Sequence, residues 1–219
     1  MDQSITNTTL FLDIGCVLLS NGWGNESRKL AAKTFNLNQD EMESRHRQNI
    51  ATNEEGKLSL SEYLNRVVFF EKRSFTPDQF REFMFNQSMP NGNMMEFVKQ
   101  LKEQYKLKIA IINNEGRILN EYLIKKFQLG QFIDFFISSC FVHYHNPETD
   151  IFRLALDIAD APDEQAVYIE DLETFVDVAD SMGIKSVRNK NYLSTSEVLS
   201  SLGLPIGDQN ENIPMYAEC

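Results

Sequence analysis

The chain has 219 residues, of which 42% are hydrophobic, and a formal net charge of −11. This is enough apolar chain for one domain with an insertion or for two small domains. The acidic balance argues against a nucleic-acid partner and against an anionic membrane surface, because both need basic side chains. A phosphorylated small molecule remains compatible with it, because a bound metal ion can outweigh a distant acidic surface.

The cysteines and the N-terminus indicate the compartment. Cys16, Cys140 and Cys219 are odd in number and widely spaced. They fit neither a disulfide framework nor a metal-binding motif, so we expect reduced thiols in a cytoplasmic protein. Residues 1–4 are polar and acidic, unlike a signal peptide, and no apolar run approaches the ~20 residues that span a bilayer. We therefore expect a soluble protein.

The first predicted strand lies within residues 8–18. Its apolar run is bounded by turn formers, which is typical of a buried central strand in a parallel sheet. The strand delivers Asp13 onto a turn that contains Gly15, at the edge where open α/β sheets bind ligands. The alternative interpretation is a plain strand end with a solvated carboxylate.

A helical segment follows the loop over residues 20–25. Asn38, Ser59 and Thr76 each precede a Glu or Gln by three residues, which indicates three helix starts. Apolar side chains recur behind these starts at helical spacing and predict the core of a small bundle: Leu60, Leu64, Val67, Val68, Phe80, Phe83 and Met84. We predict that residues 23–89 form a helical cap domain.

Beyond residue 90, predicted strands and helices alternate. The strands are expected over residues 108–112, 135–138, 166–169 and 185–187, and the helices over residues 94–105, 120–127, 150–158 and 175–182. In the helix over 150–158, Ile151, Leu154 and Ile158 are expected to point inward. Alternation predicts an α/β fold: a three-layer, Rossmann-like core with a parallel sheet. Residues 1–22 and 90–205 would form this core, and residues 206–219 a polar tail.

Two further strand ends carry polar side chains. The polar run 113–116 follows the second strand and precedes a helix, whose free N–H groups can hold an anion. Glu170 and Asp171 follow the fourth strand, where adjacent carboxylates are costly unless donors or a cation compensate them. Taken alone, this pair also fits an ordinary helix start. Together with Asp13, Asp171 predicts a hard-cation site, for which Mg²⁺ is the favoured metal.

Four stretches, taken in order, resemble the haloacid dehalogenase (HAD)-like superfamily of hydrolases, in the subgroup with a helical cap after the first strand. They are residues 11–18, 111–117, 138–147 and 168–171, and the resemblance covers about residues 8 to 202. It implies a core with a cap that selects the substrate and excludes water. It also implies an aspartate nucleophile that attacks phosphorus and becomes an aspartyl phosphate.

The resemblance assigns roles to individual residues. Asp13 would be the nucleophile and would also bind Mg²⁺, together with the Gly15 carbonyl and Asp171, with Glu170 in support. The metal would neutralise charge on the phosphoryl group. The phosphate would be held by residues of two other loops: Asn113, Asn114, His145 and Asn146.

Three positions depart from the family pattern. Gly15 stands where phosphatases of the family carry a second Asp, the acid and base, a role worth typically ~10²–10⁴-fold. Asn113 replaces Ser or Thr, although its amide can still donate to a phosphoryl oxygen. Asn146 replaces a Lys, and a missing ammonium at ~4 Å forfeits up to about 4 kcal/mol at a moderate effective dielectric. His143, His145 and Arg117 are the candidate replacements for that cation, against the commoner case of solvated surface charges.

Three hypotheses follow. The first is a Mg²⁺-dependent phosphatase of a small phosphorylated metabolite, which prefers good leaving groups such as aryl or acyl phosphates because position 15 carries no acid. Some relatives also lack the second Asp, so Gly15 alone does not exclude hydrolysis. The second is a catalytically impaired HAD-fold protein that binds a ligand or partner, favoured by the concurrent replacements. The third is a 2-haloacid dehalogenase, which also uses an Asp nucleophile but needs no metal.

Overall fold

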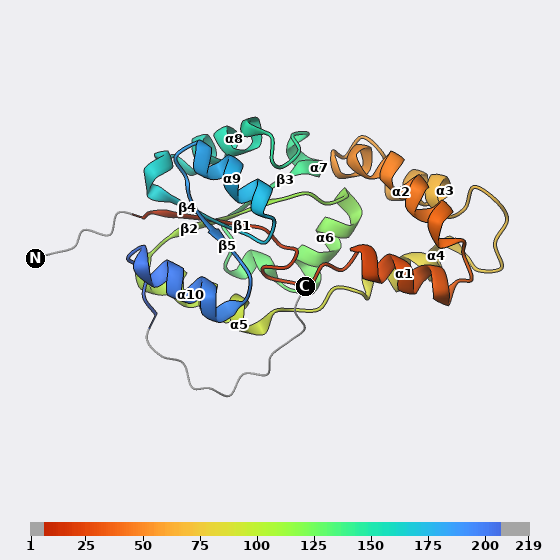
Figure 1. The fold of residues 1–219 in the computed structure, drawn as a ribbon, viewed down its shortest axis with the longest axis horizontal. Helices are drawn as coiled ribbons and strands as arrows, with labels where there is room; N and C mark the ends of the chain where they lie inside the picture. The colour runs from red at the N-terminus through yellow and green to blue at the C-terminus, as the bar shows by residue number, and fades with distance from the viewer. Residues whose placement is uncertain (1–6, 207–219) are drawn as a thin grey trace, which may run out of the picture.

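The computed structural model describes residues 7–206 (Figure 1). Of the predicted tail, residues 206–219, only residue 206 is described, and residues 207–219 lie outside this range. Five parallel strands form one sheet in the order β3-β2-β1-β4-β5, which confirms the predicted α/β fold. Their bounds are β1 Thr9–Leu12, β2 Lys108–Asn113, β3 Phe135–Ser138, β4 Ala166–Glu170 and β5 Lys185–Arg188. In the central strand, Leu12 lies opposite Ile111 of β2 and Ile169 of β4.

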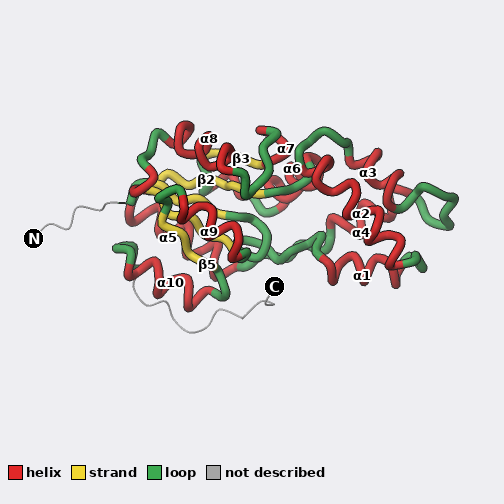
Figure 2. The backbone as a smooth tube through the Cα atoms, turned by 45° about the horizontal axis from the view of Figure 1, so that its top comes forward, coloured by secondary structure: helices red, strands yellow, loops and turns green. Residues whose placement is uncertain are grey.

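Helices cover both faces of the sheet (Figures 1 and 2). On one face lie α8 (Thr149–Ala159) and α9 (Glu173–Ser181), and on the other α5 (Gly92–Tyr105), α6 (Arg117–Lys126) and α10 (Tyr192–Ser201). The short elements are η1 Leu129–Gln131, α7 Ser139–Val142 and η2 Asp163–Gln165. Side chains alternate between two cores because strand residues point to opposite faces: Leu10 and Leu12 join one core and Phe11 the other.

The inward face of α8 differs from the prediction. Ile151 is buried as expected, but Ile158 is 51% exposed. The buried stripe is centred on Phe152, Ala155 and Ala159 instead. Two alanines on this stripe let the helix approach the sheet closely, so the face is defined by small side chains and not by the largest aliphatic ones.

Between β1 and α5 the chain forms four helices, α1 Asn25–Thr34, α2 Gln39–Glu54, α3 Leu60–Val67 and α4 Pro77–Phe85. They lie beyond the carboxyl ends of the strands, at the right of Figure 1. The expected helix starts are confirmed. The Asn38 side chain accepts from the backbone N–H of Glu41, whereas Ser59 and Thr76 form reciprocal capping boxes. We call residues 25–85 the helical segment.

The chain enters and leaves the helical segment through two connections that lie side by side. Leu19 and Pro90 form an antiparallel bridge. The backbone N–H of Ser20 donates to the Met89 carbonyl, and that of Asn91 donates to the Leu18 carbonyl, both at 2.8 Å. The helical segment is thus attached at one place. Within residues 7–206, no helix has the length and apolar character needed to cross a membrane.

Candidate metal and phosphate site

Three carboxylates meet at the carboxyl ends of the two central strands. Asp13, Glu170 and Asp171 each offer an oxygen, and these oxygens lie within 4.8 Å of one another. The sheet register brings them together, because Leu12 and Ile169 are paired and the backbone N–H of Asp13 donates to the Ile169 carbonyl at 3.1 Å. Burial, and then the charges of Glu170 and Asp171, hold the pKa of Asp13 well above its usual range. Burial also raises the pKa of Glu170 to about 7.

The three carboxylates differ in how they are hydrogen bonded. One oxygen of Glu170 accepts from the hydroxyl of Tyr168 at 2.6 Å, and the other accepts from the backbone N–H groups of Asp171 and Leu172. Glu170 is therefore held in place, and Asp13 and Asp171 retain oxygens for a ligand. An all-oxygen donor set with mutually repelling charges suits a hard divalent cation such as Mg²⁺. The residues present fit such an ion.

A side chain at position 15 would lie close to the carboxylate of Asp13, the candidate nucleophile. A Cβ at Gly15 would lie 3.3 Å from Oδ2 of Asp13, which is close for two atoms that do not bond. Gly15 lines the same cavity as Asp13 and Asp171. The glycine thus leaves the Asp13 carboxylate accessible on this side.

The predicted phosphate-binding residues also line this cavity, but their amide N–H groups are engaged by the protein. Asn113 Nδ2 donates to Asn120 Oδ1 at 3.2 Å, and Asn114 Nδ2 donates to the Asn146 carbonyl at 2.6 Å. Asn146 Nδ2 donates to the Tyr168 hydroxyl at 2.8 Å. Within residues 7–206, the side-chain oxygens of Asn113 and Asn146 are buried without a hydrogen-bond partner. Each of the three amides therefore donates an N–H to a protein acceptor.

Of the three candidate cations, His145 lines the cavity, whereas His143 and Arg117 do not. His145 Nε2 lies 2.8 Å from a carboxylate oxygen of Glu54 at the end of α2. The hydrogen bond to Glu54 raises the pKa of His145. The Arg117 guanidinium instead lies near Glu121 and donates to the Cys140 carbonyl. Pairing with the helical segment thus favours the cationic form of this histidine.

The helical segment supplies the outer wall of the cavity, which has a volume of about 360 Å³. A cap was expected here, but its individual wall residues were not predicted, because they meet the strand ends only through packing of the segment. His46 and Glu54 of α2 line it, together with Trp23 and Arg28. Arg28 is bound to Glu43 at 2.6 Å.

A buried chain of hydrogen bonds sets the state of His46. Trp23 Nε1 donates to the Tyr63 hydroxyl at 3.0 Å, and this hydroxyl lies 2.7 Å from Nδ1 of His46. Burial lowers the pKa of His46 to about 4, so the ring is neutral near neutral pH. The Tyr63 hydroxyl thus links the indole of Trp23 to the ring of His46.

The comparisons with known proteins show the family of this chain. A family model for haloacid dehalogenase-like hydrolases matches residues 14–188. The chain belongs to this family. This confirms the resemblance that the four sequence stretches indicated. A comparison with curated proteins found no match.

Solved structures of HAD-like proteins share the fold. A HAD family enzyme from Bacteroides thetaiotaomicron is 17% identical with a TM-score of 0.76, over 88% of this chain and 98% of that chain. A HAD-like family hydrolase from Porphyromonas gingivalis is 14% identical with a TM-score of 0.69, over 93% and 100%. An L-2-haloacid dehalogenase is 10% identical with a TM-score of 0.59, over 85% and 86%. At these identities the likeness establishes the fold.

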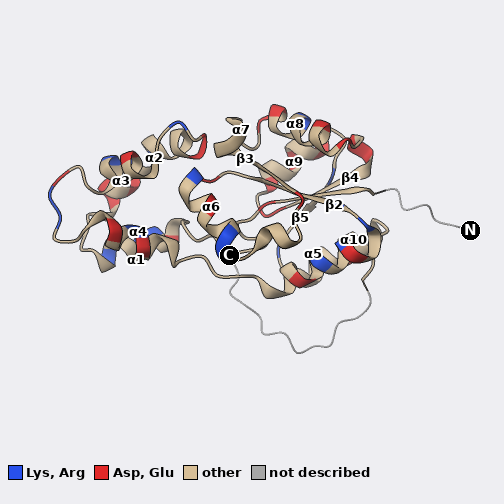
Figure 3. Cartoon of the chain, turned by 180° about the vertical axis from the view of Figure 1, so that it is seen from behind, with Lys and Arg blue, Asp and Glu red and all other residues tan. Residues whose placement is uncertain are grey.

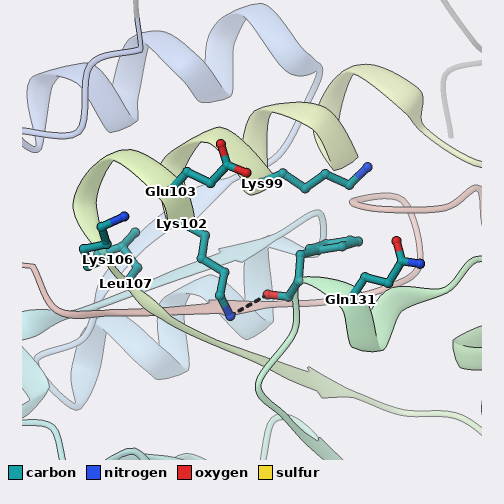
Figure 4. Close-up of a pocket in the computed structure, with 7 residues that line it drawn as sticks. Lys99, Lys102, Glu103, Lys106, Leu107 and Gln131 are labelled. Carbon is teal, nitrogen blue, oxygen red and sulfur yellow. Dashed lines mark hydrogen bonds between the residues drawn. The ribbon is translucent and has the colours of Figure 1, made fainter.

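This HAD-like protein also has a second, larger hollow of about 570 Å³ on the surface of α5 (Figure 4). Lys99, Lys102 and Lys106 line it, near Gln131 of η1. The Lys102 ammonium is already bound to the Phe132 carbonyl at 2.9 Å and to Asp134 at 2.7 Å. The hollow adjoins the amino ends of β2 and β3, whereas α/β sheets bind ligands at the carboxyl ends. Elsewhere, basic and acidic residues are interspersed along the helices (Figure 3). We therefore place the functional site at Asp13.

Proposed function

We propose that this HAD-like protein is a Mg²⁺-dependent phosphohydrolase that acts on a small phosphorylated metabolite, with Asp13 as the nucleophile. The observation that carries the proposal is the cluster of Asp13, Glu170 and Asp171 within 4.8 Å, in a cavity of about 360 Å³. That volume suits a small ligand. Solved structures of the Bacteroides thetaiotaomicron enzyme include one complex with magnesium and two complexes with magnesium and inorganic phosphate, which supports the proposal by analogy.

In the proposed reaction, an oxygen of Asp13 attacks phosphorus, the bond to the leaving alcohol breaks, and an aspartyl phosphate forms. Water then hydrolyses this phosphate and restores the carboxylate. Bound Mg²⁺, held by Asp13 and Asp171 with the Gly15 carbonyl, would neutralise phosphoryl charge and favour the ionised form of Asp13. Glu170 serves as a positioning residue, because its three hydrogen bonds fix it beside the two ligands.

We further propose that the helical segment, within the predicted cap of residues 23–89, acts as the cap of this site. Its contacts with the core support this role. The Ser139 hydroxyl donates to the Glu54 carbonyl at 2.7 Å, and Glu54 also pairs with His145. His46 and Ile50 of α2 line the outer half of the cavity. A wall of this kind excludes water and contacts the part of the substrate that is not phosphate.

A second candidate is a protein that binds a phosphorylated ligand without turning it over. The observation that favours it is the engagement of the amide donors of Asn113, Asn114 and Asn146. A phosphate group entering the cavity would find these donors already bonded to the protein, where the family places free donors and a lysine. Binding would then depend on the metal and on Arg28 and His145, which line the cavity.

The test of the proposed function is Mg²⁺-dependent release of phosphate from p-nitrophenyl phosphate and from a panel of phosphorylated metabolites. We expect Asp13→Asn to abolish it, since loss of a hydrolase nucleophile costs on the order of 10⁶-fold. Asp157→Asn, on the exposed side of α8, is the matched control and should retain activity. If unaltered protein releases no more phosphate than Asp13→Asn, the proposal fails. Ligand-dependent thermal stabilisation without turnover would favour the second candidate, and metal-free halide release from a 2-haloacid would favour a dehalogenase.

A further inference from the structure

Glu115 reaches the same cavity from the loop after β2. Because β1 and β2 are parallel neighbours with Leu12 opposite Ile111, the loops that contain Gly15 and Glu115 leave the sheet side by side. Gly15 and Glu115 both line the cavity of Asp13. A carboxyl group, that of Glu115, is therefore present in the cavity in which position 15 lacks one.

The backbone around Glu115 is fixed, while its side chain keeps one oxygen for a ligand. The backbone N–H donates to the Ser139 hydroxyl at 3.2 Å, and one carboxyl oxygen accepts from the N–H of Gly116 at 2.8 Å. The other oxygen has no hydrogen-bond partner in the part of the chain that is described. Asn53 of α2 lies directly against Gly116, where even a Cβ would collide with its amide. Glu115 thus lies where the helical segment meets the core.

The groups that face Glu115 favour its protonated form. Burial raises the pKa of Glu115 to about 8, and the charge of Glu54 from α2 contributes to the rise. Asp13 also interacts with it electrostatically, as do Tyr63 of α3 and Cys140 of α7. Each of these neighbours is acidic or neutral. Near neutral pH the side chain is therefore mainly a carboxylic acid with a proton to give.

The position of Glu115 also suits the geometry of phosphoryl transfer. The attacking and leaving oxygens lie roughly in line with phosphorus, so the leaving group lies on the side opposite the nucleophile. The helical segment lines the cavity that contains Asp13, and Glu115 lies where this segment meets the core, because the Ser139 hydroxyl links the Glu115 backbone N–H to the Glu54 carbonyl. We propose that Glu115 is the general acid and base of this HAD-like protein, in place of the acid that position 15 lacks. This inference rests on the proposed function.

The proton and electron balance closes over the two steps. As Asp13 attacks, the phosphorus–oxygen bond of the ester breaks, and the Glu115 carboxyl gives its proton to the leaving oxygen, which departs as an alcohol. The Glu115 carboxylate then takes a proton from the water that attacks the aspartyl phosphate. Phosphate leaves, the Asp13 carboxylate is restored and Glu115 is again protonated. One group serves as acid and then as base, as general acid–base catalysis requires.

The leaving group distinguishes this role from a structural one. We expect Glu115→Gln to lower kcat/KM for an alkyl ester such as glycerol phosphate by ~10²–10⁴-fold, because an alkoxide leaves poorly without a proton. The same variant should lose less than about tenfold on p-nitrophenyl phosphate, whose phenolate needs little protonation. The preference for good leaving groups, which the sequence analysis predicted for the unaltered protein, would then be seen in Glu115→Gln instead. For unaltered protein, turnover of the alkyl ester should fall as the pH rises through about 8, and Glu115→Gln should lack that decline.

Control variants separate the possible outcomes. Glu121→Gln, on the exposed face of α6, should change neither substrate, and Glu115→Asp should restore part of the alkyl-ester activity. Equal losses on both esters, or an alkaline decline that persists in a folded Glu115→Gln variant, would overturn the role of Glu115 and leave Asp13-dependent hydrolysis standing. If unaltered protein turns over neither ester above Asp13→Asn, the inference falls together with the proposed function.

Discussion

The two halves of the cavity floor are built from similar strand ends but present different groups to a ligand. In the acidic half, formed by Asp13, Glu170 and Asp171, donors hold one carboxylate and leave the other two with oxygens for a ligand. In the amide half, formed by Asn113, Asn114 and Asn146, each side-chain nitrogen donates to a neighbouring protein group. The acidic half thus keeps oxygens for a cation, whereas the amide half is bonded within the protein.

Tyr168 connects the two halves. Its hydroxyl accepts from Asn146 and donates to Glu170. Asn146 stands where the family has a lysine, and it completes a hydrogen-bond chain that ends at Glu170, beside the proposed metal ligands. The substitution therefore removes a cation and at the same time helps to position a carboxylate.

The largest expected effect tests the acidic half. Asp171→Asn should weaken Mg²⁺ binding, measured by calorimetry, by more than about 100-fold, since even indirect partners of metal ligands cost 10–100-fold. In the absence of metal, the same variant should melt at a higher temperature, because one of three mutually repelling carboxylates is neutralised. Asp177→Asn, exposed on α9, should do neither. Unchanged Mg²⁺ affinity would show that the acidic half is not a metal site.

A gain of function tests whether the amide half limits turnover. Asn146→Lys should raise kcat/KM for a phosphate ester by up to about 100-fold, because an ammonium at ~4 Å contributes up to about 4 kcal/mol at a moderate dielectric. Part of this is offset by the lost bond to Tyr168. Asn146→Met, which introduces a side chain about as long as lysine but uncharged, should give no gain. Activity that appears only in Asn146→Lys would identify the natural chain as a binder of phosphorylated ligands.

Removal of one oxygen atom, the Tyr168 hydroxyl, would break the hydrogen-bonded connection between the two halves. Tyr168→Phe leaves the amide of Asn146 without its acceptor and Glu170 without one donor. We expect the free energy of unfolding, measured in urea, to fall by about 1–3 kcal/mol, the cost of an unsatisfied buried polar group. Tyr144→Phe is the control, since Tyr144 is 41% exposed, and it should change little. A fall in both variants alike would argue against the bridging role of Tyr168.

The smallest expected effect concerns the closure over both halves. Glu54 raises the pKa of His145 above its usual value of 6.5, so their pairing stabilises the fold fully below that value and loses this effect as pH rises through the raised pKa. Glu54→Gln should therefore cost roughly 1 kcal/mol in mildly acidic buffer and progressively less toward alkaline pH, as chemical denaturation at each pH would show. Glu41→Gln, exposed on α2, should show no such trend. A cost that grows with pH would contradict this pairing.

Much of this organisation could be predicted from single segments of sequence. Apolar strands followed by Asp13 and by Glu170 with Asp171 placed the acidic half correctly, because a parallel register brings strand ends together. The amide half was predicted in position but not in state, since its residues bond to one another only in the folded geometry. α10 went unpredicted, because its serine-rich sequence has a weak apolar pattern.

The individual residues of the outer wall could not be predicted for a different reason. Glu54 and His46 lie on a helix whose own pattern indicates only solvent and bundle contacts. Glu54 meets His145 because the helical segment packs onto α7 and α6, and no local periodicity encodes that contact. Glu115 lies in the predicted polar run 113–116, but its raised pKa depends on burial, which the sequence does not show.

The paired connections at Leu19 and Pro90 have a mechanical consequence. Two independent linkers would let the helical segment twist as well as tilt, whereas linkers bonded to each other resist twisting, because twisting would break the bonds between them. We expect the segment to rotate as a rigid body about these paired connections once its contacts with Ser139, His143 and His145 of the core are broken. Such a rotation carries Glu54 away from both His145 and Glu115 at once. The same movement would then admit substrate and expose the Glu115 side chain to water.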